Sequence, residues 1–512
     1  MSQEIRANYD QMDLLPQCLE DWVPRDHPAR FIREFVDALN LGELGFQQRE
    51  SEEGRPAYAA DLLLKVWVYG YLRRIHSTRE LERACRENLG LLWLTGRNDP
   101  DHNPSADGWR FWRDNLVALR GVFRQVVRVA KKNQLVGLIC HAVDGTKIRA
   151  ACSRRTMEHA KELQEELAKV EASIQEMERA LEEAEAREEG EYRLPAALAE
   201  QQQLREAIRG SLGKMQAAGR EHLHPQEPEA RMMKCEGRQE PAYNAQAVVE
   251  EQHQLIVAEA VVNEENDAHE LTAMIGEVQR NLGEVAKETV ADGGYASAEE
   301  LGKAEEKGYG VVASLKDPSP LGEFHSSRFQ YDPERDQVVC PRGEGLSFQG
   351  IRRHRQKPFP LRVYRCQDFG DCPLREACTR DRHGRLIEIG PYHGAVERQR
   401  QKQAEAEKRQ LLKKRKEMVE PVFGTIKQGM GFRRYTVRGL EKVKTQWSLI
   451  CAAFNLRKLL GLWSEGKLRF HGPTQTPPLP GRSAALQQRL STNVKCLSIA
   501  FRAIAVRPSC AF

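Results

Sequence analysis

Short apolar segments that alternate with helical ones most constrain the fold of this chain. Five segments are predicted as strands, at 136–143, 245–249, 255–262, 288–291 and 310–315. Helical patterns at 268–282 and 297–307 separate the last three of these strands. A long helical stretch separates the first strand from the second. Without that stretch, the order is three strands, a helix, a strand, a helix and a strand.

This order predicts an α/β fold, an RNase H-like core with a mixed sheet. The second and third strands flank a polar turn at 250–254 and form an antiparallel hairpin. The long helical stretch is then an insertion into a surface loop, where extra residues cost little closure entropy. The core domain is expected at 131–155 and 222–465, with the insertion at 156–221.

Heptad spacing marks the insertion as helical. Apolar residues spaced four and three apart form a seam on the first helix, at Leu163, Leu167, Val170, Ile174, Met177 and Leu181. Gly190 and Pro195 interrupt the helix, and a second, less regular apolar face follows at 194–215. We expect an antiparallel helical hairpin; an intermolecular coiled coil is the alternative.

Residues 1–130 are predicted to be helical. The run 61–72 is strongly apolar without clean alternation, and Ser77 with Glu80 has the spacing of a capping box. The pattern fits a compact domain resembling a helix-turn-helix, or a helical packing domain with no role in DNA binding. At the other end, the proline-rich segment 466–512 is expected to be disordered.

Charge is distributed unevenly, although the net charge is only +4. Residues 156–206 are rich in glutamate, whereas 398–444 are dominated by lysine and arginine. Such a basic stretch is typical of a protein that binds a phosphate backbone, with a solvated basic helix as the alternative. The apolar runs fall short of the roughly 20 residues of a membrane span, and no signal pattern stands at the N-terminus. We expect a cytoplasmic protein without a membrane partner.

Three carboxylates have the character of metal ligands. Asp144 is predicted at the end of the first strand, Asp292 at the end of the fourth, and Glu420 after a long basic helix. Cleavage of a phosphodiester can use hard oxygen ligands that hold two Mg²⁺ ions about 4 Å apart. Taken singly, each carboxylate is more simply explained as a solvated surface residue.

The segments 143–147, 291–295 and 419–427 resemble the three acidic blocks of bacterial insertion-sequence DDE transposases. The resemblance is closest to the branch numbered eleven-eighty-two, related to the insertion sequence four and five groups, and it extends over about 8–463. It implies an enzyme that cleaves DNA at the ends of its element and joins the exposed 3′-hydroxyl to a target. Alternatives are a catalytically inactive, transposase-derived DNA-binding protein and a structural coiled-coil protein.

The resemblance implies roles for individual residues. Asp144, Asp292 and Glu420 would be the catalytic residues and hold two Mg²⁺ or Mn²⁺ ions. Lys427 matches the lysine that touches DNA near the cleaved end. It follows Glu420 by seven residues, about two turns, so an unbroken helix would place both on nearly the same face. Pro421 would kink or restart such a helix.

Other family positions match less well. The tyrosine and arginine that precede the glutamate in the family are not clearly present, and Lys413 and Lys416 occupy their spacings, next to Arg415. DNA contacts are expected from five basic residues, Lys427, Arg415, Lys416, Arg433 and Arg434. Asn244 also resembles a family motif, or is simply a hydrogen-bonding residue at a strand end.

Four cysteines lie in an expected insertion at 325–385, between the second aspartate and the glutamate. They are Cys340, Cys366, Cys372 and Cys378. Four thiolates in one loop-rich region could hold a structural Zn²⁺, although their spacing is not that of paired cysteines two residues apart. Reduced, partly buried cysteines are the alternative.

The resemblance also implies partners. DNA would be bound as the terminal inverted repeats of the element and as target DNA, with the helical N-terminal domain on the repeats. Chemistry on paired ends would need at least a homodimer on DNA. An active copy would be associated with the nucleoid.

Overall fold

The computed structural model describes residues 18–47, 57–101, 107–185, 194–315, 323–354, 359–367, 369–370 and 372–470. Most of the expected disordered tail, from residue 471 on, lies outside these ranges. Within them, no helix combines the length and the apolar character needed to cross a membrane.

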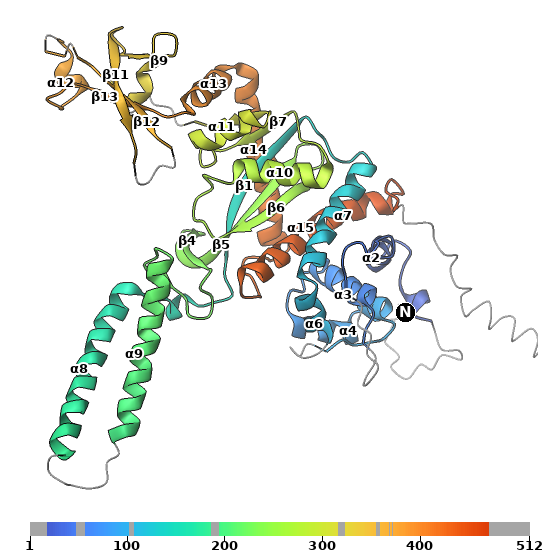
Figure 1. Cartoon of the computed structure of the whole chain (residues 1–512). Helices are drawn as coiled ribbons and strands as arrows, with labels where there is room; N and C mark the ends of the chain where they lie inside the picture. Colours follow the sequence, from blue (N-terminus) through green and yellow to red (C-terminus); the bar gives the residue numbers. More distant parts are fainter. Residues whose placement is uncertain are drawn as a thin grey trace, which may run out of the picture.

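A mixed sheet forms the centre of the molecule (Figure 1). Its strands are β1 (Cys140–Arg149), β4 (Arg231–Cys235), β5 (Arg238–Glu250), β6 (Ile256–Val262), β7 (Glu288–Ala291) and β8 (Val311–Ala313). They lie in the order β4-β5-β1-β7-β8, and β6 pairs with β5 beyond the end of β4. Pairing is antiparallel among β1, β4, β5 and β6, and parallel from β1 to β7 to β8. This arrangement is consistent with the expected RNase H-like core.

The first strand differs from its prediction. It begins at Cys140 rather than at residue 136, and it runs through Asp144 to Arg149 instead of ending at the aspartate. The cause is the long antiparallel pairing with β5, which extends as far as Arg149 opposite Ala242. Strand β4, which pairs with the first half of β5, was not expected from the sequence pattern.

Helices pack on the sheet from three parts of the chain. They are α10 (Leu271–Leu282), α11 (Ala298–Glu306), α13 (His393–Ala404), α14 (Ala406–Gly424) and α15 (Leu440–Ser464). Helix α14 contacts β1, β7 and β8, whereas α10 and α15 contact β6. Trp447 of α15 is fully buried and its Nε1 donates a hydrogen bond of 3.0 Å to the Gln246 carbonyl of β5, so this part of α15 holds the sheet.

The N-terminal part is helical, as expected. Its helices are α1 (Leu19–Trp22), α2 (Pro28–Asp37), α3 (Ala60–Leu72), α4 (Thr78–Glu87), α5 (Leu89–Thr95), α6 (Asp107–Asp114) and α7 (Leu116–Lys132). Ser77 is the N-cap residue of α4, but its side chain makes no capping hydrogen bond, so the expected capping box is wrong. Helices α3 and α7 pack against α15, which joins this part to the core in one apolar cluster.

The start of the expected tail is ordered by packing. Leu468 is buried, and the ring of Phe470 lies 5.3 Å from that of Phe31 and 5.7 Å from that of Phe35. The boundary expected at 466 is therefore wrong, because residues up to 470 cover α2. The sequence pattern could not show this contact, since it joins residues more than 400 positions apart.

Two long helices project from the sheet between β1 and β4. They are α8 (Ala160–Glu185) and α9 (Leu194–Ala217), which run side by side in opposite directions (Figure 1). A small strand pair at their base joins β2 (Glu158–His159) to β3 (His222–Leu223). Leu163, Val170 and Ile174 of the seam pack in a separate cluster with Ile208 and Met215.

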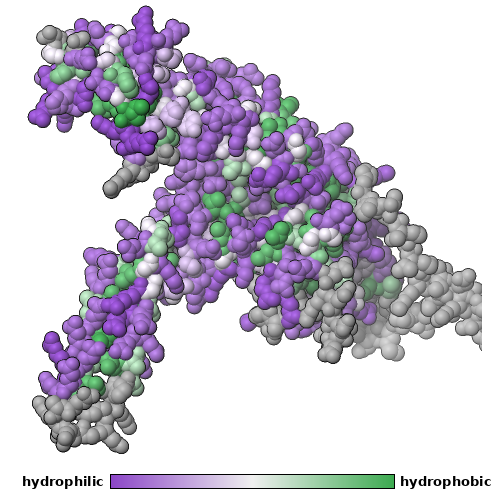
Figure 2. Space-filling model, viewed as in Figure 1, coloured by the Kyte–Doolittle hydropathy of each residue, from purple (hydrophilic) through white to green (hydrophobic). Residues whose placement is uncertain are grey.

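A second, smaller sheet follows β8. It orders β13 (Leu386–Ile389), β12 (Leu361–Arg365), β11 (Gly345–Arg352), β10 (Gln337–Val339) and β9 (Gln330–Asp332), with the short helix α12 (Arg375–Cys378) beside them. It has its own apolar cluster around Phe329, Val338 and Tyr364. The visible face of the described protein is largely hydrophilic, with hydrophobic residues in small patches (Figure 2).

Candidate active site

Two of the three expected carboxylates lie at the same edge of the sheet. The parallel pairing of β1 with β7 ends at Ala142 opposite Val290. Asp144 and Asp292 are each two residues further along their own chain segments, β1 continuing and β7 having ended. Equal offsets from one paired position place both residues at the same level of the sheet. Strand register thus brings together two of the three residues that the resemblance implies as a triad.

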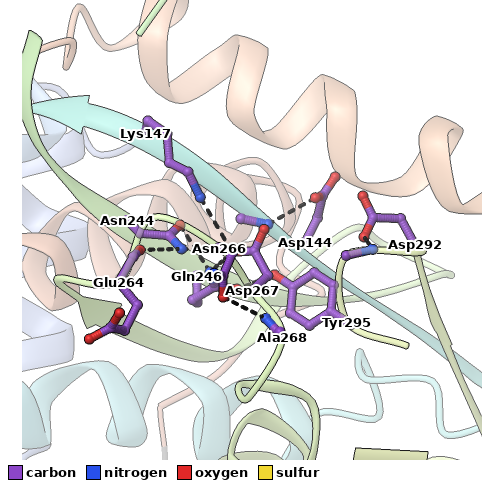
Figure 3. Close-up of polar contacts among 12 residues, drawn as sticks. Asp144, Lys147, Asn244, Gln246, Glu264, Asn266, Asp267, Ala268, Asp292 and Tyr295 are labelled. Atoms are coloured by element: carbon purple, nitrogen blue, oxygen red, sulfur yellow. Dashed lines mark hydrogen bonds and ion pairs between the residues drawn. The ribbon is translucent and has the colours of Figure 1, made fainter. Parts of the chain in front are cut away.

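The charges of Asp144 and Asp292 interact. Burial raises the pKa of Asp144, and the nearby charge of Asp292 raises it further. The Arg415 guanidinium and the Gly145 N–H, which donates a 2.9 Å hydrogen bond to Oδ1, act in the opposite direction. Asp292 accepts a 2.8 Å hydrogen bond from the Gly294 N–H. Figure 3 shows the two carboxylates next to each other, so the pair is a concentration of negative charge at the sheet edge.

Glu420 lies on α14 and is exposed. The same helix packs on β1 and β7, but it is Arg415 that reaches the site, with Nη1 2.8 Å from Asp144 Oδ2. In the part of the chain that the structure describes, no three His, Cys, Asp or Glu side chains are placed to hold one metal ion. Strand register therefore brings two of the three carboxylates together, and Glu420 lies on a helix that packs over their strands.

Helix α14 runs through Pro421 to Gly424 without a restart, unlike the expected break. A proline has no N–H for the carbonyl four residues earlier. That carbonyl, on Glu417, instead accepts a 3.1 Å hydrogen bond from Gln254 Nε2 in the turn between β5 and β6. The side chain of Gln254 thus satisfies the carbonyl group that Pro421 leaves without a helical partner.

The helix changes form after Gly424. Residues Thr425–Gly429 form a π-helical segment, so the face shared by Glu420 and Lys427 in an unbroken α-helix is not maintained. Lys427 is partly buried, and burial lowers its pKa while nearby Glu236 raises it. Arg433 pairs with that same Glu236 at 2.9 Å and donates to the Lys427 carbonyl.

The remaining expected DNA contacts differ in their surroundings. Lys416 is exposed on α14. Arg434 instead donates to the carbonyls of Ala150 and Cys152, at 3.1 and 2.8 Å, and so fastens the C-terminal segment to the end of β1. Of the five basic residues, Lys416 has the free surface position that a phosphate contact needs, whereas Arg415 and Arg434 are engaged within the protein.

A polar network beside the carboxylates was missed from the sequence. Asp267, in the turn between β6 and α10, accepts hydrogen bonds from Asn244 and Gln246 of β5 (Figure 3). Tyr295, three residues after Asp292, donates to Gln246 Oε1. Asn244 was noticed through the family motif, but no pattern in the sequence pointed to Asp267, which lies in irregular structure.

The four expected zinc ligands line one pocket of about 260 Å³ in the smaller sheet domain. Burial raises the pKa of Cys378, and nearby Cys340 and Cys372 raise it further. Arg342 and Arg385 line the same pocket. The thiols share a pocket, but they are not among the described groups placed to hold a metal ion.

A second pocket, of about 340 Å³, is basic. Arg73 and Arg74, at the end of α3, line it together with Arg457 of α15. All three are exposed, and their side chains form no ion pair with the described residues. Unpaired guanidinium groups from two helices therefore face one hollow at the junction of the N-terminal part and the core.

Two separate segments of the chain match known protein families. Residues 17–107 match a family described as "Transposase domain (DUF772)", and residues 339–460 match a family described as "Transposase DDE domain". Both matched segments are therefore similar to domains of transposases. The comparison with curated proteins gives no match. The transposase DDE match includes Glu420, Arg415 and Lys427, whereas Asp144 and Asp292 lie before it, so their assignment rests on the geometry above.

Proposed function

We propose that the protein is the transposase of a bacterial insertion sequence, of the branch that its acidic blocks resemble. It would bind the ends of its element, cut the DNA there and join the exposed 3′-hydroxyl to a target. The placement of Asp144 beside Asp292 at the edge of a mixed sheet is the observation that carries this proposal. The two transposase domain matches support it independently.

The carboxylate pair fits a divalent cation. Two neighbouring carboxylates repel each other, and the raised pKa of Asp144 reflects both this repulsion and its burial. Asp144 and Asp292 would hold Mg²⁺ or Mn²⁺, with Glu420 as the third ligand. When bound, two such ions supply charge stabilisation at the phosphate and an activated nucleophile.

Arg415 is the protein group that now balances the pair. Its guanidinium opposes the rise in the pKa of Asp144 that burial and Asp292 cause, and it occupies one carboxylate oxygen. We propose that Arg415 exchanges Asp144 for a DNA phosphate when DNA and metal bind, because an arginine fork suits both partners. That exchange would free Asp144 Oδ2 at the moment when substrate arrives.

DNA binding would use surfaces on both sides of the core. The basic pocket of Arg73, Arg74 and Arg457 supports a phosphate contact at the N-terminal domain, which we assign to the terminal repeats. Lys416, Lys427 and Arg433 would lie nearer the cut. We further propose that two copies act together on paired ends, in the cytoplasm at the nucleoid.

A second candidate is a DNA-binding protein that has lost catalysis. It is favoured by the ion pair of Arg415 with Asp144 and by the exposed position of Glu420. In that case the arginine would be a permanent replacement for metal ions, and the protein would bind DNA without cutting it.

One experiment separates the two candidates. The inverted repeats flanking the gene are made as labelled duplexes and incubated with protein and Mg²⁺ or Mn²⁺. Wild type is compared with Glu420→Gln and with Glu417→Gln, a matched change one turn earlier on α14. We expect cutting at the repeat boundary by wild type and Glu417→Gln but not by Glu420→Gln. Binding without cutting by all three would favour the second candidate, and equal cutting by all three would refute the role of Glu420.

A further inference from the structure

A buried polar network lies directly behind the carboxylate pair. Oδ1 of Asp267 accepts hydrogen bonds of 2.6 Å from both Asn244 Nδ2 and Gln246 Nε2, and Lys147 Nζ lies 3.4 Å from the same oxygen. Asn244 and Gln246 are fully buried, and Gln246 also donates to Asn244 Oδ1 at 2.9 Å. One carboxylate oxygen thus collects three donors from two strands, an arrangement that fixes its position.

The network touches the strand that carries Asp144. Gly145 leaves the necessary space, because a Cβ at this residue would lie 2.6 Å from Gln246 Nε2 and 2.9 Å from Asp267 Oδ1. The N–H of Gly145 is the donor to Asp144 Oδ1. A displacement of Asp267 would therefore move the backbone group that orients Asp144.

The network also reaches the turn that carries Asp292. The buried Tyr295 donates its hydroxyl hydrogen to Gln246 Oε1, and its backbone N–H binds the Asp292 carbonyl at 3.2 Å. Asp267 Oδ2 and Asp292 Oδ1 both approach Gly294, at 3.8 and 3.0 Å from the point where a Cβ would stand. Figure 3 shows Asp267 next to Gln246 and Tyr295.

We propose that Asp267 is a positioning residue that fixes the distance between Asp144 and Asp292. It acts along two chains of contacts, both of which begin at Gln246. One leads from Gln246 to Gly145, and the other leads from Gln246 through Tyr295 to the turn of Asp292. This inference rests on the proposed function, because the distance matters only if the pair binds cations. Groups that orient the ligands of a metal commonly change metal affinity by about 10- to 100-fold when removed.

The test compares Asp267→Asn with wild type. The substitution keeps the shape of the side chain and removes the acceptor charge. Two quantities are measured: the Mn²⁺ concentration that gives half of the metal-induced rise in Tm without DNA, and the one that gives half-maximal cutting of bound end DNA. We expect both concentrations to rise about 10-fold or more, with cutting partly restored at high Mn²⁺.

Glu250→Gln is the matched control. Glu250 is a fully buried carboxylate at the other end of β5 that accepts hydrogen bonds from three backbone N–H groups of the β5–β6 turn. The Glu250→Gln substitution should lower Tm without changing the Mn²⁺ concentration that either measurement requires. If Asp267→Asn prevents folding, Asn244→Ala removes one donor to Asp267 and is tested in the same way, with the same expectation.

The outcomes separate this inference from the proposed function. Active wild type with an unchanged Mn²⁺ requirement in the folded variants would overturn the positioning role alone. Wild type that neither cuts DNA nor gains stability from Mn²⁺ would overturn both. A raised Mn²⁺ requirement in Asp267→Asn and not in Glu250→Gln would support the positioning role.

Discussion

Arg415 Nη1 lies 2.8 Å from Oδ2 of Asp144, and the two side chains are only 12% and 21% exposed. The arginine comes from the helix that also carries Glu420, five residues further on. The contact therefore connects α14, which carries Glu420, to Asp144 on β1. It also places a positive charge beside the carboxylate that would bind a metal cation. Substitution of Arg415 should show whether Asp144 and Asp292 need a positive charge beside them.

We expect Arg415→Gln to make the protein less stable by about 1–3 kcal/mol at neutral pH, because Asp144 then lacks its charged partner beside Asp292. Mn²⁺ should restore more of the lost stability in this variant than it adds to wild type. Thermal unfolding with and without Mn²⁺ measures both effects. Arg398→Gln, which breaks an exposed ion pair with Glu305, is the control and should show no such dependence.

The same variant has a predicted pH dependence. The guanidinium of Arg415 lowers the pKa of Asp144, whereas burial and Asp292 raise it. Without the arginine, the pKa of Asp144 rises, and the carboxylate becomes protonated at a higher pH as the solution is acidified. The acid limb of kcat/KM for cutting, which reports the free protein before Arg415 exchanges Asp144 for a phosphate, should therefore move to higher pH in Arg415→Gln. An unchanged acid limb would show that Asp144 does not set the acid limb of the free protein.

Glu259 of β6 gives a prediction about stability that is independent of catalysis. Burial raises the pKa of Glu259 to about 7, against an opposing hydrogen bond from Ser448 of α15. The folded protein therefore holds this proton more tightly than the unfolded chain does. Its contribution to stability is complete at low pH and is lost as pH rises from about 4.5 through about 7.

Glu259→Gln should remove this dependence. Because the residue is partly exposed, we expect the variant to be more stable than wild type by only about 1–2 kcal/mol at pH 8, with no gain at pH 4. Urea unfolding at both pH values measures the difference. A gain of equal size at the two pH values would mean that ionisation of Glu259 is not its cause.

The sequence predicted the parts of the fold that depend on local pattern. Strand β7 has the expected bounds, because a short apolar run ends at Asp292-Gly293-Gly294. The end of β1 was misplaced, since its length is set by pairing with β5 rather than by its own residues. Asp267 was missed for a related reason: its partners Asn244 and Gln246 come from a strand 21 or more residues earlier, and a turn residue carries no periodicity. The ion pair of Arg415 with Asp144 joins residues 271 positions apart and could not be inferred.

The basic pocket at the end of α3 predicts a salt-dependent contact. Each phosphate that an arginine neutralises steepens the fall of log K with log salt by about 0.9 for duplex DNA. We expect Arg73→Gln with Arg457→Gln to weaken binding of end DNA and to reduce the slope by about 2. Titrations at several salt concentrations measure the slope. Arg209→Gln on α9, where Arg209 pairs with Glu171, changes one charge away from the pocket and should leave the slope unaltered. A slope unchanged by the double substitution would exclude the pocket from the DNA interface.

The cysteine pocket gives the last prediction. Cys340, Cys366, Cys372 and Cys378 line one hollow, and four thiolates are a ligand set that suits a structural Zn²⁺. We expect about one zinc per chain in protein purified without chelator, and loss of that zinc in Cys372→Ser. Elemental analysis measures the content, and Cys18→Ser, an exposed cysteine elsewhere, should retain it.

The stability of the smaller sheet provides the second readout for zinc. Its apolar cluster is small, so a metal that joins its loops would contribute a large share of its stability. A chelator should then expose this domain to proteolysis before the core, where α14 and α15 pack on the sheet. Protein that contains no zinc, takes up none and resists proteolysis equally with and without chelator would show that the four cysteines are reduced, partly buried residues. Arg342 and Arg385, which line the same pocket, would then hold it together without a metal. Arg385 donates hydrogen bonds to the carbonyls of Cys378 and Phe324.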